Sequence, residues 1–343
     1  MRLLAALALL GLLAAACSVE VESDAGPVES AEIADPVADP VTDTVDPELV
    51  GTRWGFALSP RSYTDPDFPD FLALIDGEAD VLAHVGDWID LAEPNNPFVV
   101  LDALAEGYGM ETLMVISPSS AESLVRPLDE ATRASYLADL RAYLAEQQPE
   151  YLGLGNEVNM VLTDHPDDFD AIVSLLEEAT AVVRELSPDT EVFVVLQYEW
   201  LIGERGGWFG RGRAPADWQV IDRFDFVDAI GFTTYPSLVF DDPSELADDY
   251  YARIADHTDL PVLFTEVGWT AEPLPVLPGS EDEQARYVER FGELTSSLDL
   301  AVAVWPFVFS DLIEHAAFQG TGLMRSDGTP RPAWDAWQEL RAG

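Results

Sequence analysis

The stretch YLGLGNEVNM covers residues 151–160. Its first half alternates apolar side chains with glycine, as a short buried strand does, and it runs directly into Asn156 and Glu157. Because an ionisable group beside a core is costly, a carboxylate at the tip of such a strand indicates a functional site. A second stretch, LPVLFTEVGW at 260–269, repeats the arrangement around Glu266. The two glutamates predict a pair of carboxylates facing each other across one site.

Apolar runs and segments with helical spacing alternate along the rest of the chain. The strand-like runs span 53–58, 81–85, 112–116, 151–155, 192–197, 227–232, 262–265 and 301–306. The helix-like segments span 68–76, 98–107, 129–146, 167–186, 217–224, 243–257, 281–297 and 332–341. Eight such units predict an α/β fold, a single (β/α)8 TIM barrel over residues 51–343. The alternative, an open doubly wound sheet, would usually carry a glycine-rich phosphate loop after its first strand, and no such loop occurs there.

The N-terminus has the features of an export signal. One arginine and an apolar run precede Cys17, and the run is too short to span a bilayer. The residues before Cys17 resemble the lipobox of bacterial lipoproteins, which implies a signal peptide over 1–17 and lipidation of Cys17. The alternative is an ordinary secreted protein cut nearby. Residues 18–50 hold ten acidic residues, no basic ones and repeated Asp-Pro, which predicts a disordered tether.

The composition limits the partners. The formal net charge is −47, with 17 arginines and no lysine, so the surface repels nucleic acid and anionic membranes. Cys17 is the only cysteine, and the four histidines are scattered, so we expect neither disulfides nor a bound metal. The sequence therefore predicts an exported monomer, in the cell envelope or secreted, that needs no cofactor and touches a membrane only through Cys17.

Polar and aromatic residues follow the apolar runs, and the active sites of (β/α)8 barrels lie at those strand ends. The candidate substrate-binding residues are His84, Asp87, Trp88, Asn156, Tyr198, Tyr235, Trp269 and Trp305. Aromatic rings stack on the apolar faces of sugars, and sugar hydroxyls seek carboxylates and amides. Cleavage of a glycosidic bond needs two carboxyl groups, for which Glu157 and Glu266 are the candidates.

Each candidate also has a structural interpretation. Glu157 could form an ion pair with an arginine at a strand end, and His84 could be a hydrogen-bonded core histidine. The tryptophans and tyrosines could simply fill the barrel core. A metal-dependent deacetylase or phosphodiesterase on the same fold would need His/Asp clusters, which the sequence lacks.

The motif Gly155-Asn156-Glu157, with Glu266 ending a later strand, resembles the clan of retaining (β/α)8 glycoside hydrolases. The pair GNEV and EVGW is similar to the β-1,3-glucanases of family 17. AIGFTTYP at 229–236 is more similar to the endo-β-1,4-galactanases of family 53. The resemblance covers the last five strands. It is poor in the first third, where the clan commonly has an arginine and this chain has His84 and Asp87.

The resemblance implies a role for each matching residue. Glu157 would be the general acid/base and Glu266 the nucleophile, about 5–5.5 Å apart. Asn156 would bond the sugar 2-hydroxyl, Tyr235 would donate to Glu266, and Trp305 would lie under the sugar. The implied activity is retaining, endo-acting hydrolysis of a β-linked polysaccharide or oligosaccharide. The alternatives are a non-catalytic glycan-binding barrel lipoprotein and a transporter-linked solute-binding protein.

Overall fold

A computed structural model describes residues 51–93, 96–118 and 126–343. The predicted signal peptide, the predicted tether and Cys17 lie outside the described residues.

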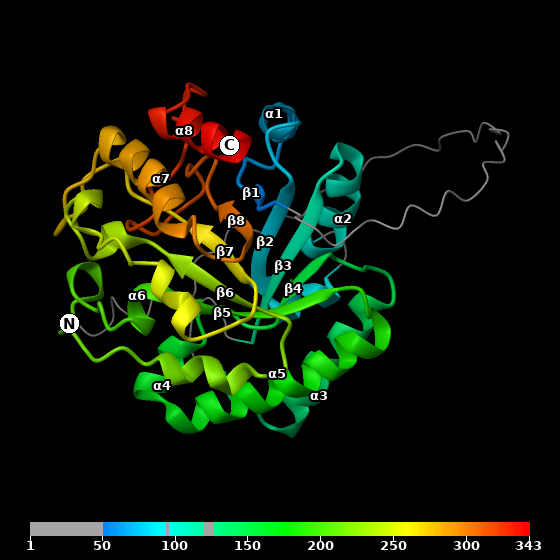
Figure 1. Cartoon of the computed structure of the whole chain (residues 1–343). Coiled ribbons are helices and arrows are strands. Elements are labelled where there is room, and N and C mark those ends of the chain that lie inside the picture. Colours follow the sequence, from blue (N-terminus) through cyan, green and yellow to red (C-terminus); the bar gives the residue numbers. More distant parts are fainter. Residues whose placement is uncertain (1–50, 94–95, 119–125) are drawn as a thin grey trace, which may run out of the picture.

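Eight parallel strands close into a barrel at the centre of the molecule (Figure 1). In chain order they are β1 (Arg53–Ala57), β2 (Val81–Asp87), β3 (Glu111–Ser117), β4 (Tyr151–Gly153), β5 (Glu191–Gln197), β6 (Ala229–Thr234), β7 (Val262–Val267) and β8 (Leu300–Trp305). Each strand pairs with its sequence neighbours, and β8 pairs with β1. The predicted single (β/α)8 barrel is confirmed.

Helices surround the barrel (Figure 1). They are α1 (Asp67–Ile75), α2 (Pro97–Tyr108), α3 (Glu130–Leu144), α4 (Asn159–Asp164), α5 (Pro166–Leu186), α6 (Tyr198–Leu201), α7 (Glu281–Thr295) and α8 (Pro332–Ala342). Local sequence sets several of their starts. Asn96, Asp129 and Ser280 each accept a hydrogen bond from the backbone N–H three residues later, which satisfies one of the free donors of the first turn.

Two predicted helices are absent from the outer layer. Residues 217–224 form a 3₁₀ segment, η4 (Trp218–Phe224), and residues 243–257 contain only η6 (Pro243–Glu245) and η7 (Ala252–Asp256). Within the second segment, the sequence neighbours Tyr250 and Tyr251 are both buried. A surface helix buries one stripe of side chains, so packing both rings favours an irregular backbone. The other 3₁₀ segments are η2 (Trp88–Ala92), η3 (Gly207–Phe209) and η5 (Pro236–Leu238).

The barrel interior is filled by a cluster of its own. Its members are Val81, Ala83, Val85, Leu113, Val115, Phe193, Val195, Ala229, Leu263, Val302 and Val304. Side chains alternate between the two faces of a strand, so the residues between these face outward and pack against the helices. This alternation decides which side chains can reach the mouth of the barrel.

A register shift in β7 breaks the alternation. Phe232 of β6 pairs with Phe264, but the next residue, Thr233, pairs with Glu266, so Thr265 is the extra residue of a bulge. Without the shift, Glu266 would face the outer layer as Phe264 does. The bulge instead gives Glu266 the orientation of Thr233, at the mouth of the barrel.

Candidate active site

Glu157 lies beyond the end of β4 in an unusual backbone conformation. Its φ is 50°, and it is the only residue other than glycine with a positive φ in the part of the chain that the structure describes. Such a conformation costs about 1–3 kcal/mol, and it persists where the surroundings hold it. The Thr233 hydroxyl donates a hydrogen bond of 2.6 Å to Glu157 Oε1. The side chain is 6% exposed.

Glu266 receives its hydrogen bond from an aromatic hydroxyl. The Tyr235 hydroxyl donates to Glu266 Oε2 over 2.6 Å. A Cβ on Gly268 would lie 2.5 Å from the Tyr235 ring, so glycine at this position lets the ring approach the backbone. Glu266 is 1% exposed, and its Oε1 has no hydrogen-bond partner.

Burial dominates the electrostatics of the pair. Burial, opposed by the Thr233 hydroxyl and reinforced by the charge of Glu199, raises the pKa of Glu157 to about 7. Burial, reinforced by the charge of Glu157 and opposed by Tyr235 and Asn156, raises the pKa of Glu266 to about 8. Two interacting carboxyls lose their protons as a pair, so near neutral pH the site holds one proton and one negative charge. Each of the two carboxyls can carry that proton, and the hydrogen bond from Tyr235 favours the ionised form of Glu266.

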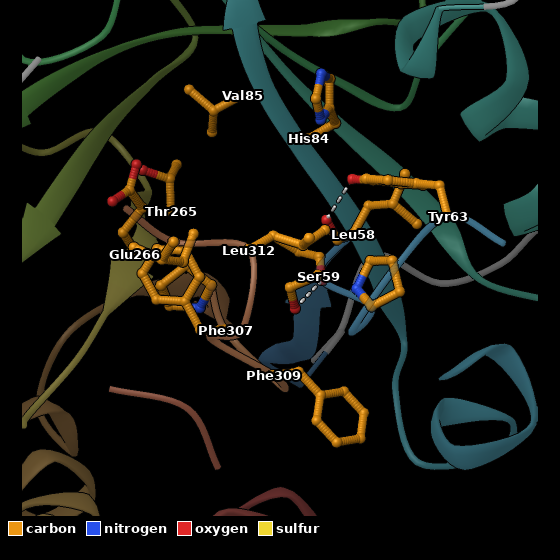
Figure 2. A pocket seen from close by; sticks show the side chains of 14 residues that line it. Leu58, Ser59, Tyr63, His84, Val85, Thr265, Glu266, Phe307, Phe309 and Leu312 are labelled. Carbon is orange, nitrogen blue, oxygen red and sulfur yellow. Dashed lines mark hydrogen bonds between the residues drawn. The ribbon is translucent and has the colours of Figure 1, made fainter. Parts of the chain in front are cut away.

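A small pocket opens beside Glu266 (Figure 2). Figure 2 shows Glu266 and Thr265 on one side, with His84 and Tyr63 across from them. Burial lowers the pKa of His84 to about 4, so its imidazole is neutral at pH 7. The lining is otherwise mostly apolar, and it includes Leu58, Phe307, Phe309, Leu312 and Ile313.

Apolar side chains form one cluster next to the pocket, because Phe307 belongs to both and Tyr235, which contacts Glu266, is also a member. They come from the connections after β4 to β8 and include Met160, Trp200, Phe209, Leu238, Leu277, Phe307 and Phe318. The cavity beside Glu266 has a volume of only about 40 Å³. Pockets for small ligands measure about 300–1,000 Å³, so a sugar ring does not fit in this conformation.

The structure brings together four of the predicted site residues. Glu157, Glu266, Asn156 and Tyr235 form one cluster, within which Asn156 and Tyr235 both lower the pKa of Glu266. Asn156 Oδ1 is buried and accepts no hydrogen bond. His84 lines the pocket beside Glu266.

Four predicted aromatic residues are not at the site. Trp305 is fully buried on the outer face of β8, where its ring meets Trp337 and its Nε1 donates to the Thr321 carbonyl. The predicted role of Trp305 as a sugar platform is therefore wrong, because Val304 takes the inward position. The remaining three also pack in the outer layer: Trp269 on Tyr287, Trp88 on Tyr136 and Tyr198 on Tyr250.

Asp87 has a structural partner. Both of its oxygens accept hydrogen bonds from Arg126, and its Oδ1 also accepts from the Ile89 N–H. The Arg126 guanidinium lies 5.3 Å from the centre of the Trp88 ring. A carboxylate held in this way is occupied, so the structure gives no support to Asp87 as a substrate ligand.

Sequence reasoning missed several residues of the site. Thr233 precedes Tyr235 by two residues. Its hydrogen bond to Glu157 depends on the register of the barrel strands, which the sequence does not show. Glu199, which has the sequence context of an exposed loop carboxylate, is fully buried. Phe307 lines the pocket in place of Trp305; it lies three residues beyond the inward Val304, so strand alternation, which points to Pro306, does not predict it.

The described residues contain no group of three or more His, Cys, Asp or Glu side chains arranged to hold a metal ion. Within the same residues, no helix is long and apolar enough to cross a bilayer.

Comparisons with protein-family models and with curated protein sequences gave no match. Solved structures do match. Xylanase 10B from Thermotoga maritima is 14% identical, covers 84% of this chain and 94% of its own, and has a TM-score of 0.56. A mutant of P. fluorescens subsp. cellulosa xylanase A in complex with xylopentaose is 13% identical over 85% and 98%, with a TM-score of 0.57. An exo-β-1,4-mannosidase from an Opitutaceae bacterium is 14% identical over 85% and 59%, with a TM-score of 0.62.

These similarities place the fold among the (β/α)8 barrels that glycoside hydrolases use. They do not support the finer resemblance to families 17 and 53. At 13–14% identity they show the fold, while the chemistry has to be argued from the side chains of this chain.

Proposed function

We propose that this protein is a retaining glycoside hydrolase that cleaves β-linked glycans. The observation that carries the proposal is the buried pair Glu157 and Glu266, which interact electrostatically and share the mouth of one barrel. Neither carboxylate has an arginine partner among the described residues, so the ion-pair interpretation of Glu157 loses its basis. The fold of the xylanases and the mannosidase supports the same reaction class.

The pair can divide the work of a double displacement. One carboxylate attacks the anomeric carbon, and the other, protonated, gives its proton to the leaving oxygen and later takes one from water. The raised pKa of Glu157 suits the acid/base role, because a carboxyl that keeps its proton near neutral pH can donate it. The Tyr235 hydroxyl bond favours the ionised form of Glu266, as a nucleophile requires.

Substrate entry requires movement of the side chains around the cavity beside Glu266. The cavity has a volume of about 40 Å³. Side chains that line it, Phe307 and Ile313 among them, therefore have to move aside before a sugar reaches Glu266. The small cavity, which leaves no room for a sugar beside Glu266, weighs against catalysis and so favours the second candidate function, a non-catalytic barrel lipoprotein that binds glycans at another surface.

Turnover distinguishes the two candidates. Wild type and Glu266→Gln are incubated with β-1,4-xylan, β-1,4-mannan, β-1,4-galactan and β-1,3-glucan, and reducing ends are measured. The enzyme proposal expects release by wild type and none by the variant. The exposed Glu314→Gln, in the connection after β8, is the control and should match wild type. Binding to a glycan by wild type without release would instead support the second candidate.

We also propose that the chain is exported as a lipoprotein anchored at Cys17. The sequence of the first 17 residues supports this proposal. Metabolic labelling with palmitate should mark the wild type and not Cys17→Ser. Labelling of neither protein would leave secretion without an anchor as the better interpretation.

A further inference from the structure

Glu199 is the most fully enclosed carboxylate near the site. It belongs to α6, directly after β5, and it is 0% exposed. No ion pair joins it to an arginine within the described ranges 51–93, 96–118 and 126–343. A buried carboxylate without a cation is costly unless hydrogen bonds compensate it, so its partners explain its presence.

Four groups donate to Glu199. Its Oε2 accepts from Gln197 Nε2 over 2.6 Å and from the Tyr235 backbone N–H over 3.2 Å. Its Oε1 lies 2.7 Å from the Thr234 hydroxyl and 3.1 Å from the Tyr250 hydroxyl. An ionised carboxylate has about four acceptor positions, and this arrangement fills them all. These hydrogen bonds favour the ionised form of Glu199, while burial raises its pKa.

One of these donors belongs to the residue that contacts Glu266. Tyr235 gives its backbone N–H to Glu199 and its hydroxyl to Glu266. It stands where β6 has ended and η5 begins, with φ −136° and ψ 72°, so no sheet ladder fixes its backbone. Glu199 thus anchors the main chain from which the phenol reaches Glu266.

The same network extends toward Glu157. Asn159, two residues after Glu157, makes two hydrogen bonds to the backbone of Gln197. Its Nδ2 donates to the Gln197 carbonyl over 3.0 Å, and its Oδ1 accepts from the Gln197 N–H over 2.8 Å. Gln197 in turn donates to Glu199. A continuous set of hydrogen bonds therefore runs from the Glu157 segment through Glu199 to Tyr235.

We infer that Glu199 is a positioning residue, which holds Tyr235 so that its hydroxyl keeps Glu266 in the orientation needed for attack. The inference rests on the proposed function, since it assigns Glu266 a reaction. It adds a third glutamate to the two that the sequence singles out, and this one does not touch the substrate.

The charge of Glu199 affects the pKa of Glu157, and a residue with a purely structural role would have no such effect. Besides burial, the Thr233 bond and the coupling with Glu266, the charge of Glu199 acts on the pKa of Glu157, which it raises. The other titratable groups facing Glu199 are phenols with raised pKa values, and they stay neutral: Tyr198, Tyr250, Tyr251 and Tyr287. Removing the charge should therefore lower the pKa of Glu157.

The test compares wild type with Glu199→Gln on an aryl β-glycoside that wild type cleaves. Glutamine keeps the side-chain length, but its nitrogen cannot accept the bonds that one oxygen now receives. We expect kcat to fall by up to about 10²-fold, as for a misplaced reactive group, with KM nearly unchanged. The alkaline limb of the kcat/KM profile should move to lower pH. Glu199→Asp, which keeps the charge, should leave that limb in place.

Glu204→Gln is the matched control, because Glu204 lies five residues away and pairs with Arg213 on the surface. It should match wild type. A wild-type kcat in Glu199→Gln, or a loss of kcat with a lower melting temperature and an unmoved alkaline limb, would overturn the positioning role.

A titration by NMR of protein labelled with ¹³C-glutamate separates this inference from the proposed function. The Glu157 signal is assigned with Glu157→Gln, and its pKa is read in wild type and in Glu199→Gln without any turnover. Suppose that the pKa of Glu157 is lower in Glu199→Gln than in wild type, but that wild type cleaves no glycoside. This result would support the hydrogen-bond network and reject the proposed enzymatic function. An unchanged pKa in an active enzyme would reject the network alone.

Discussion

Glu157 and Glu266 are buried to nearly the same extent, yet the chain presents them differently. Glu157 follows a strand of three residues and reaches the site through a strained backbone with positive φ. Glu266 lies inside a strand of six residues and reaches the site through a bulge. One accepts from an aliphatic hydroxyl, and the other from a phenol. Two separate departures from regular backbone geometry are thus needed to bring one carboxylate pair together.

The difference also bears on protonation. A phenol is a stronger hydrogen-bond donor than an aliphatic hydroxyl, which favours the anion on Glu266. Burial raises the pKa of both carboxyls, so the pair keeps one proton near neutral pH. Kinetics can decide which residue attacks, because the two roles depend differently on the leaving group and on pH.

The largest effect should come from removing each carboxylate in turn. Glu266→Gln should lose activity by a factor on the order of 10⁴ or more on every substrate, because no covalent intermediate can form. Glu157→Gln should lose as much on a glycan but far less on a dinitrophenyl glycoside, whose leaving group needs no proton. Kinetics on both substrates measure this. If Glu157→Gln is the variant that is inactive on both, the roles are reversed.

Tyr235→Phe should have the next largest effect. Its hydroxyl lowers the pKa of Glu266, so removing it raises that pKa and moves the acid limb of the kcat/KM profile to higher pH. We expect kcat to fall by a factor of about 10–100, since a charge-assisted hydrogen bond of about 1.5–3 kcal/mol is lost. Tyr63→Phe, in the pocket wall opposite Glu266, is the comparison variant. A shift of the alkaline limb would instead make Glu266 the acid.

Thr233→Val should have the smallest effect on kcat, and it should move the alkaline limb of the kcat/KM profile, whereas Tyr235→Phe moves the acid limb. The Thr233 hydroxyl lowers the pKa of Glu157, so its loss raises that pKa and moves the alkaline limb to higher pH. The expected change in kcat is a few-fold, roughly the 0.5–1.5 kcal/mol of a typical hydrogen bond. Thr265→Val, which loses a longer bond of 3.4 Å to the Phe232 carbonyl, serves as the control. An unmoved alkaline limb would contradict the role of Glu157 as the acid.

Local sequence patterns were enough to predict the barrel and to single out Glu157 and Glu266. Apolar runs of four to six residues alternate with segments of helical spacing, and this local pattern survives in the structure because parallel strands are buried on both faces. The sequence also predicts Asn156 and Tyr235, since Asn156 directly follows an apolar run, Tyr235 comes three residues after another, and strand ends meet at one face of a barrel.

The directions in which the side chains point depend instead on how the strands pair in the folded barrel. Trp305 faces the helices, because the register of β8 gives the inward position to Val304. Glu266 faces the mouth, because a bulge reverses the alternation of β7. The four hydrogen bonds of Glu199 come from three segments of the chain and leave no local pattern in the sequence. A one-residue change of register exchanges the two faces of a strand, and residues far apart in the chain set that register.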